Sequence, residues 1–109
     1  MGAMPAYVYL HPDIEAAYTY AASESGAALE WIPCYCGCGP HSGHTNNRDC
    51  FVRPGGAGFD EHGSQCAVCV DIALSVRDAL AQGKTLAQAR ALVDARYAGY
   101  PPTDTPLPP

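Results

Sequence analysis

The sequence has 109 residues and a formal net charge of −5, and its six Lys and Arg residues are scattered rather than clustered. Without a basic patch, binding to nucleic acid or to an anionic membrane surface is not expected. No apolar run approaches the length of about 20 residues that a membrane-spanning helix needs. Residues 1–4 are expected to be a remnant of cloning, residues 5–100 a single helical domain, and residues 101–109 a disordered proline-rich tail.

Two helices are expected before residue 33. Pro12 suits the first position of a helix, and apolar residues then recur on one face until Gly26, a residue type that commonly ends helices. A short second helix over residues 27–32 has to end before Pro33, because the residue preceding a proline is disfavoured in the helical conformation.

Residues 33–62 form a long segment rich in glycine, histidine and cysteine, without the periodicity of a helix or a strand. A loop of this length is unusual in a compact domain unless something organises it. A covalent cross-link or a bound metal ion is therefore expected in this segment.

The stretch PCYCGC, at residues 33–38, places three cysteines at alternating positions. In an extended chain, side chains two residues apart lie about 6.6 Å from each other. Thiolates that share one zinc-like ion must lie only about 3.7 Å apart. Gly37 and Gly39 would allow the backbone to curl around one ion; alternatively, the three thiols bind different ions of a cluster. Either arrangement favours a soft-metal binder over ordinary packing.

A third helix is expected to begin near residues 63–65 and to end at Gly83. Cys66 and Cys69 then fall on one face of its first turn. The positive end of the helix dipole lies there and favours the thiolate, which is both a metal ligand and a nucleophile.

Thr85 and Gln88 have the spacing of a capping box, which predicts the start of a fourth helix. No strand pattern is found. The predicted fold is a small all-α domain of about four helices with one long Cys/Gly/His-rich metal-binding loop.

The predicted metal ligands are all the cysteines of the chain, with three histidines as additional candidates. These residues are Cys34, Cys36, Cys38, Cys50, Cys66, Cys69, His41, His44 and His62. His11 is assigned to the start of the first helix. Asp49 and Asp60 are expected to orient a loop or neighbouring imidazoles rather than to bind a soft ion.

Cu(I) is the metal that this ligand set favours. Thiolate-rich sites select Cu(I), zinc or iron–sulfur clusters. The cysteine spacing matches neither common ferredoxin pattern, which disfavours an iron–sulfur cluster. A structural zinc ion needs about four ligands and would leave some thiols without a role.

Other functions of the cysteines stay open. Cys66 and Cys69 form a C-x-x-C pair, which is also the motif of thiol–disulfide oxidoreductases. An even number of cysteines is typical of an exported domain stapled by disulfides, and a zinc ion can serve as a purely structural staple. No carboxylate pair, phosphate-binding loop or serine nucleophile motif is found, so a binding protein is favoured over an enzyme.

The segments IPCYCGCGPHSGHTNNRDCFV and FDEHGSQCAVCVDIALSVRDALAQGKTLAQARALVDARY resemble the bacterial PCYCGC-motif family. The resemblance runs from HPDIEAAY to Tyr97. Members are exported proteins of uncharacterised function, often with lipoprotein-type signals. The resemblance implies an extracytoplasmic location, with the full-length protein anchored to the membrane as a lipoprotein and its signal absent from this sequence. The expected partners are the metal ion and a copper-delivery protein.

Overall fold

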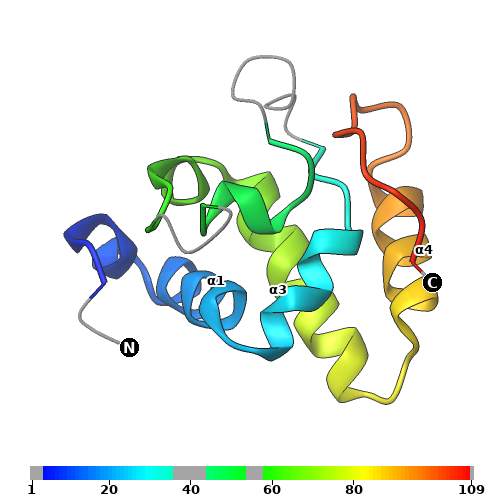
Figure 1. Ribbon diagram of the computed structural model, residues 1–109, viewed down its shortest axis with the longest axis horizontal. Helices are drawn as coiled ribbons and strands as arrows, with labels where there is room; N and C mark the ends of the chain where they lie inside the picture. Colours follow the sequence, from blue (N-terminus) through cyan, green and yellow to red (C-terminus); the bar gives the residue numbers. More distant parts are fainter. Residues whose placement is uncertain (1–3, 36–43, 54–57, 109) are drawn as a thin grey trace.

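The computed structural model describes residues 4–35, 44–53 and 58–108 (Figure 1). Three α-helices lie in these ranges: α1 (Pro12–Ala22), α3 (Ala67–Ala81) and α4 (Leu86–Arg96). Four short 3₁₀ helices accompany them: η1 (Ala6–Leu10), η2 (Ser25–Trp31), η3 (Arg48–Cys50) and η5 (Glu61–Gln65). Within the same ranges the only β-pairing is an isolated bridge between Val52 and Phe59. The predicted small all-α fold is confirmed.

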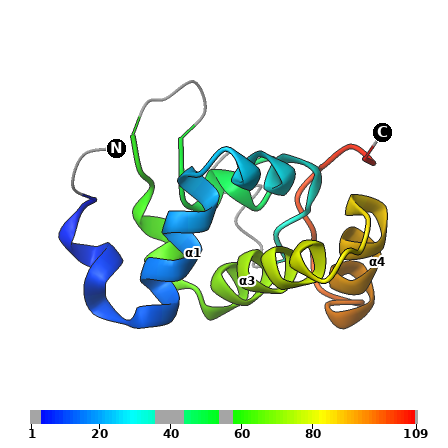
Figure 2. The same cartoon turned by 90° about the horizontal axis from the view of Figure 1, so that it is seen from below.

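Helix α3 is central to the arrangement. Helix α1 packs against one part of it and α4 against another, and the two views agree on this order (Figures 1 and 2). The 3₁₀ helix η2 contacts all three α-helices, so the segment that follows it is directed into the middle of the domain. In the part of the chain that the structure describes, no helix combines the length and the apolar character needed to cross a bilayer.

Helix α1 begins where the sequence predicts. Pro12 lies in its first turn, and the His11 side chain caps the helix by accepting a hydrogen bond from Asp13 N at 3.1 Å. Its apolar face includes Ala17 and Tyr18, which are fully buried. The assignment of His11 to the start of a helix is confirmed.

The predicted end of this helix at Gly26 is wrong. Helix α1 ends at Ala22, because Ser23 is extended (ψ 165°) and its hydroxyl donates to Tyr20 O at 2.6 Å. Gly26 lies inside η2 instead, where an added Cβ would lie only 2.1 Å from Tyr20 O. Glycine is needed at this position for the close approach of two backbone segments.

The short helix predicted over residues 27–32 forms as the 3₁₀ helix η2. It stops at Trp31, and Ile32 is extended (φ −116°, ψ 123°), as expected for a residue before Pro33. The chain therefore leaves η2 in an extended conformation and delivers Cys34 to the interior, where its side chain is 0% exposed.

Helix α3 begins later than predicted. Residues 61–65 form the separate 3₁₀ helix η5, which the Asp60 side chain caps by accepting from His62 N at 2.9 Å. Cys66 is extended (φ −132°, ψ 109°) and is the N-cap residue of α3. Cys69 is consequently in the first turn of α3, whereas Cys66 lies just before it.

The connection between α3 and α4 follows the prediction. Gly83 has a φ of +89°, a conformation that L side chains rarely adopt. Gln88 N donates to Thr85 Oγ1 at 3.1 Å, and Thr85 N donates to Gln88 Oε1 at 2.9 Å. The predicted capping box is therefore formed, and it fixes where α4 starts.

The core joins the helices to the cysteine-bearing segments. Tyr18 and Phe51 are both 0% exposed, and their rings meet edge to face with centroids 5.0 Å apart. Phe51 directly follows Cys50, so this aromatic pair anchors the end of η3 against α1.

The C-terminal segment contacts the backbone of Cys34. Residues 101–108 contain no helix or strand, but Thr103 N donates to Cys34 O and Cys34 N donates to Thr103 Oγ1, both at 3.0 Å. Thr103 and Thr105 are buried, and their hydroxyl oxygens are 2.8 Å apart. The predicted domain boundaries, including the disordered tail, stay predictions.

Candidate metal centre

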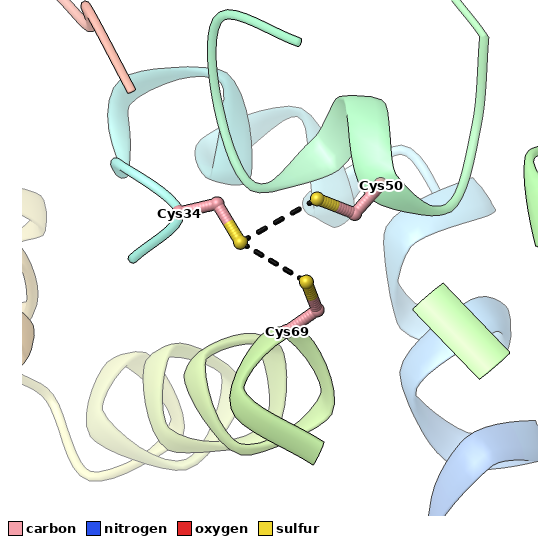
Figure 3. Close-up of side chains that lie close together, drawn as sticks. All are labelled: Cys34, Cys50 and Cys69. Atoms are coloured by element: carbon pink, nitrogen blue, oxygen red, sulfur yellow. Dashed lines mark hydrogen bonds between the residues drawn. The ribbon is translucent and has the colours of Figure 1, made fainter. Parts of the chain in front are cut away.

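Three cysteine sulfur atoms from separate segments converge in the interior (Figure 3). Cys34 follows η2, Cys50 is the last residue of η3, and Cys69 lies in the first turn of α3. The Sγ of Cys34 is 3.1 Å from that of Cys69 and 3.4 Å from that of Cys50. All three side chains are 0% exposed. Part of the predicted convergence, between the PCYCGC segment and the start of the downstream helix, is therefore observed.

These distances suit a thiolate site better than a covalent pair. A disulfide bond has an S–S length of about 2.05 Å, well below the distances here. Thiolates on one ion lie about 3.7 Å apart, so a shift of a few tenths of an ångström would let the three sulfur atoms share a cation. Because unbalanced thiolate charge is costly in a dry interior, a soft cation is the partner that would stabilise this set.

Asn47 contacts two of the three cysteines, a role that no sequence pattern indicates. It is 0% exposed, and its Nδ2 lies 3.7 Å from Cys34 Sγ and donates to Cys69 O at 3.2 Å. Among the described residues its Oδ1 has no hydrogen-bond partner. The sulfur of Cys34 therefore has an amide donor beside it. Asparagines are common in loops, so only the three-dimensional contacts identify this one.

His44 is oriented toward the sulfur cluster by Asp60. The Nε2 of His44 lies 3.2 Å from Asp60 Oδ2, and its Nδ1 lies 3.6 Å from Cys50 Sγ. A proton on Nε2, shared with the carboxylate, leaves the Nδ1 lone pair directed at Cys50. The backbone carbonyl oxygen of Asp60 also accepts a hydrogen bond from the Tyr18 hydroxyl, which holds Asp60 against α1. The prediction that Asp60 orients an imidazole is confirmed.

Asp49 has the other expected role, that of ordering the loop. Its Oδ2 accepts from Thr45 N at 2.9 Å and from Thr45 Oγ1 at 3.1 Å. These bonds fix the turn between His44 and η3. Asp49 is therefore a loop-ordering residue, as predicted.

A second group of possible ligands adjoins the first and shares one residue with it. The side-chain ligand atoms of His62, Cys66 and Cys69 all lie within 4.8 Å of one another. His62 and Cys66 are half-buried, in contrast to the fully buried Cys69. The rings of His44 and His62 meet edge to face with centroids 5.5 Å apart, so His44, which contacts Cys50, also contacts the second group.

The remaining predicted ligands lie outside the described residues. These are Cys36, Cys38 and His41. Their participation stays a prediction, as does metal ligation by the residues that the structure brings together.

Tyr35, next to Cys34 in the chain, stays protonated near the site. Burial, together with its hydrogen bond to Asp94, raises the pKa of Tyr35 to about 12. Its ring stacks on that of Tyr97, whose pKa is also raised by burial and by a hydrogen bond to Asp71. Neither phenol therefore supplies an anionic ligand at neutral pH.

A family model described as "Protein of unknown function with PCYCGC motif" matches residues 2–108. Neither the curated proteins nor the solved structures include a match to this chain.

Proposed function

The chain belongs to the PCYCGC-motif family, and from that premise we propose that it binds a soft metal ion, Cu(I), for sequestration or delivery. Cys34, Cys50 and Cys69 are the proposed core ligands. The proposed setting is extracytoplasmic, with the full-length protein anchored to the membrane as a lipoprotein. A copper-delivery protein is the proposed partner.

The observation that carries the proposal is the meeting of three buried sulfur atoms. Their segments are up to 35 residues apart in the chain, and each segment places its cysteine at the same point of contact. Packing alone requires only small apolar side chains at such a point. A soft cation gives a reason for sulfur in all three positions.

The three-sulfur set is the reason for proposing Cu(I) rather than zinc. Cu(I) is satisfied by two or three thiolates, whereas structural zinc takes about four ligands in a tetrahedron. Within the described ranges, the group around Cys34 whose ligand atoms all lie within 4.8 Å of one another contains cysteines alone. His44 Nδ1 contacts one of them, Cys50, at 3.6 Å, so it stands beside a three-sulfur set.

A thiol–disulfide oxidoreductase explains fewer of these contacts. Cys66 is half-buried at the start of α3, which suits an attacking thiol. However, Cys34 and Cys50 would have no role in exchange at the surface, because both are 0% exposed. The metal-binding function uses them directly.

The direct test is a Cu(I) titration of anaerobically purified protein against the chelator bicinchoninate, combined with metal analysis and a count of reactive thiols. We expect the chain to remove at least one ion from the chelator, with its α-helical circular dichroism retained. Protein that takes no metal from the chelator and shows fewer than two reactive thiols would contradict the proposal. Rapid exchange with small disulfides that depends on Cys66 would instead support the oxidoreductase.

The variant His44→Ala is expected to separate the two metals. Loss of the imidazole should weaken Zn(II) binding by about tenfold or more, because zinc needs a fourth ligand, and leave Cu(I) affinity within about threefold. Competition titrations with each metal measure this difference. His11→Ala, which removes an exposed histidine at the start of α1, is the matched control. Equal weakening for both metals would argue for a site that includes His44 and against the three-sulfur set.

A further inference from the structure

Cys69 belongs to two groups of potential ligands that differ in exposure. One contains the fully buried Cys34 and Cys50, and the other contains the half-buried His62 and Cys66. Building on the Cu(I) function, we propose that His62 and Cys66 form an outer site that receives the ion and passes it to the buried cysteines through Cys69.

The buried group needs such a route. The side chains of Cys34, Cys50 and Cys69 are all 0% exposed, so a donor molecule cannot place its own ligand against them. A cation that lost its ligands before it gained new ones would be bare in a dry interior, which is strongly unfavourable. Transfer is feasible when each new bond to sulfur forms before an old one breaks.

Cys66 is the cysteine of this set that borders the surface. It lines a cleft of about 430 Å³ between the start of α1 and the start of α3. Asp13 lines the same cleft, as does Asp71, which pairs with Arg96 at 3.0 Å, and the chain as a whole carries a net charge of −5. Negative charge around a cleft attracts cations.

The backbone gives Cys66 and Cys69 their different positions. Cys66 is the extended N-cap residue of α3, whereas Cys69 points from the first helical turn into the core (Figure 3). Because all ligand atoms of His62, Cys66 and Cys69 lie within 4.8 Å of one another, an ion held by the first two is already within reach of Cys69. The Sγ of Cys69 in turn lies 3.1 Å from the Sγ of Cys34.

The transfer is a series of ligand exchanges without a change of oxidation state. The thiolate of Cys66 binds Cu(I) and replaces one ligand of the donor, and Cys69 binds as the donor leaves. Cys34 and Cys50 then replace Cys66 and His62. Each thiol that binds releases its proton to solvent, and the ion stays Cu(I) throughout. Delivery follows the same steps in reverse.

The test measures the rate of uptake separately from the affinity. Stopped-flow absorbance follows the Cu(I)–bicinchoninate complex as the full chain, or a variant, removes its ion. For Cys66→Ser we expect uptake to slow by about tenfold or more, because the accessible thiolate is lost, while the affinity for the first ion stays within about threefold. His62→Ala should slow uptake less. Ser64→Ala is the matched control. Ser64 lies in η5 together with His62, and its substitution should leave the uptake rate unchanged.

The possible results distinguish this inference from the proposed function. Uptake by Cys66→Ser at the wild-type rate would overturn the outer site and leave Cu(I) binding intact. An affinity loss of tenfold or more in Cys66→Ser would also overturn it, because Cys66 would then be a permanent ligand. If the wild-type protein took no Cu(I) from the chelator, the proposed function itself would be contradicted.

Discussion

Replacing Cys69 with serine is expected to weaken Cu(I) binding by more than about 100-fold. Loss of a residue that only orients a ligand costs about 10–100-fold in affinity, and Cys69 is a proposed ligand in both the buried and the outer group. A hydroxyl is a hard, neutral ligand that does not replace a thiolate for a soft ion. Competition titration with bicinchoninate measures the change.

The control for this variant is Ala73→Ser, one turn further along α3. Ala73 is also 0% exposed, so the substitution buries a hydroxyl on the same helix while leaving every cysteine in place. We expect Ala73→Ser to bind Cu(I) as the wild type does. If Cys69→Ser bound Cu(I) within about tenfold of the wild type, the convergence on Cys69 would have no role in metal binding.

Replacing Phe51 with alanine is expected to lower the free energy of unfolding by about 3–5 kcal/mol, the usual cost of removing a buried aromatic ring. Phe51 is 0% exposed, its ring packs edge to face on Tyr18, and an added Cβ on Gly63 would lie 2.4 Å from it. The ring therefore holds α1, η3 and η5 together. Urea denaturation followed by circular dichroism measures the loss.

Leu10→Ala is the comparison for Phe51→Ala, because Leu10 is 72% exposed and should change the stability by less than about 0.5 kcal/mol. Cu(I) added to Phe51→Ala should recover part of the lost stability, since binding favours the folded state. A loss below about 1 kcal/mol for Phe51→Ala would mean that the aromatic contact does not organise the core.

The sequence predicted the features that depend on local chemistry. Pro12, Gly83 and the Thr85–Gln88 capping box act through their own backbone neighbours, and the structure has each of them as expected. The stop before Pro33 has the same local origin. The pattern of cysteines likewise indicated that separate segments meet, because thiols in these numbers have few other uses.

Features that depend on distant partners could not be predicted in this way. Gly26 resembles a helix end in the sequence, but the approach of the Tyr20 carbonyl is what requires it. Asn47 is an ordinary loop residue until the fold places it against Cys34 and Cys69. The break between η5 and α3 lies at the extended Cys66, which no hydrophobic periodicity records.

Thr103 connects the sulfur cluster to a remote part of the molecule. It hydrogen-bonds both the amide and the carbonyl of Cys34, and the Arg90 guanidinium donates to the carbonyl oxygens of Thr105 and Pro106. A shift of Cys34 on loading of the proposed site would therefore be passed to Thr103 through these hydrogen bonds. Through these hydrogen bonds, the conformation of the C-terminal segment would depend on whether the proposed site holds an ion.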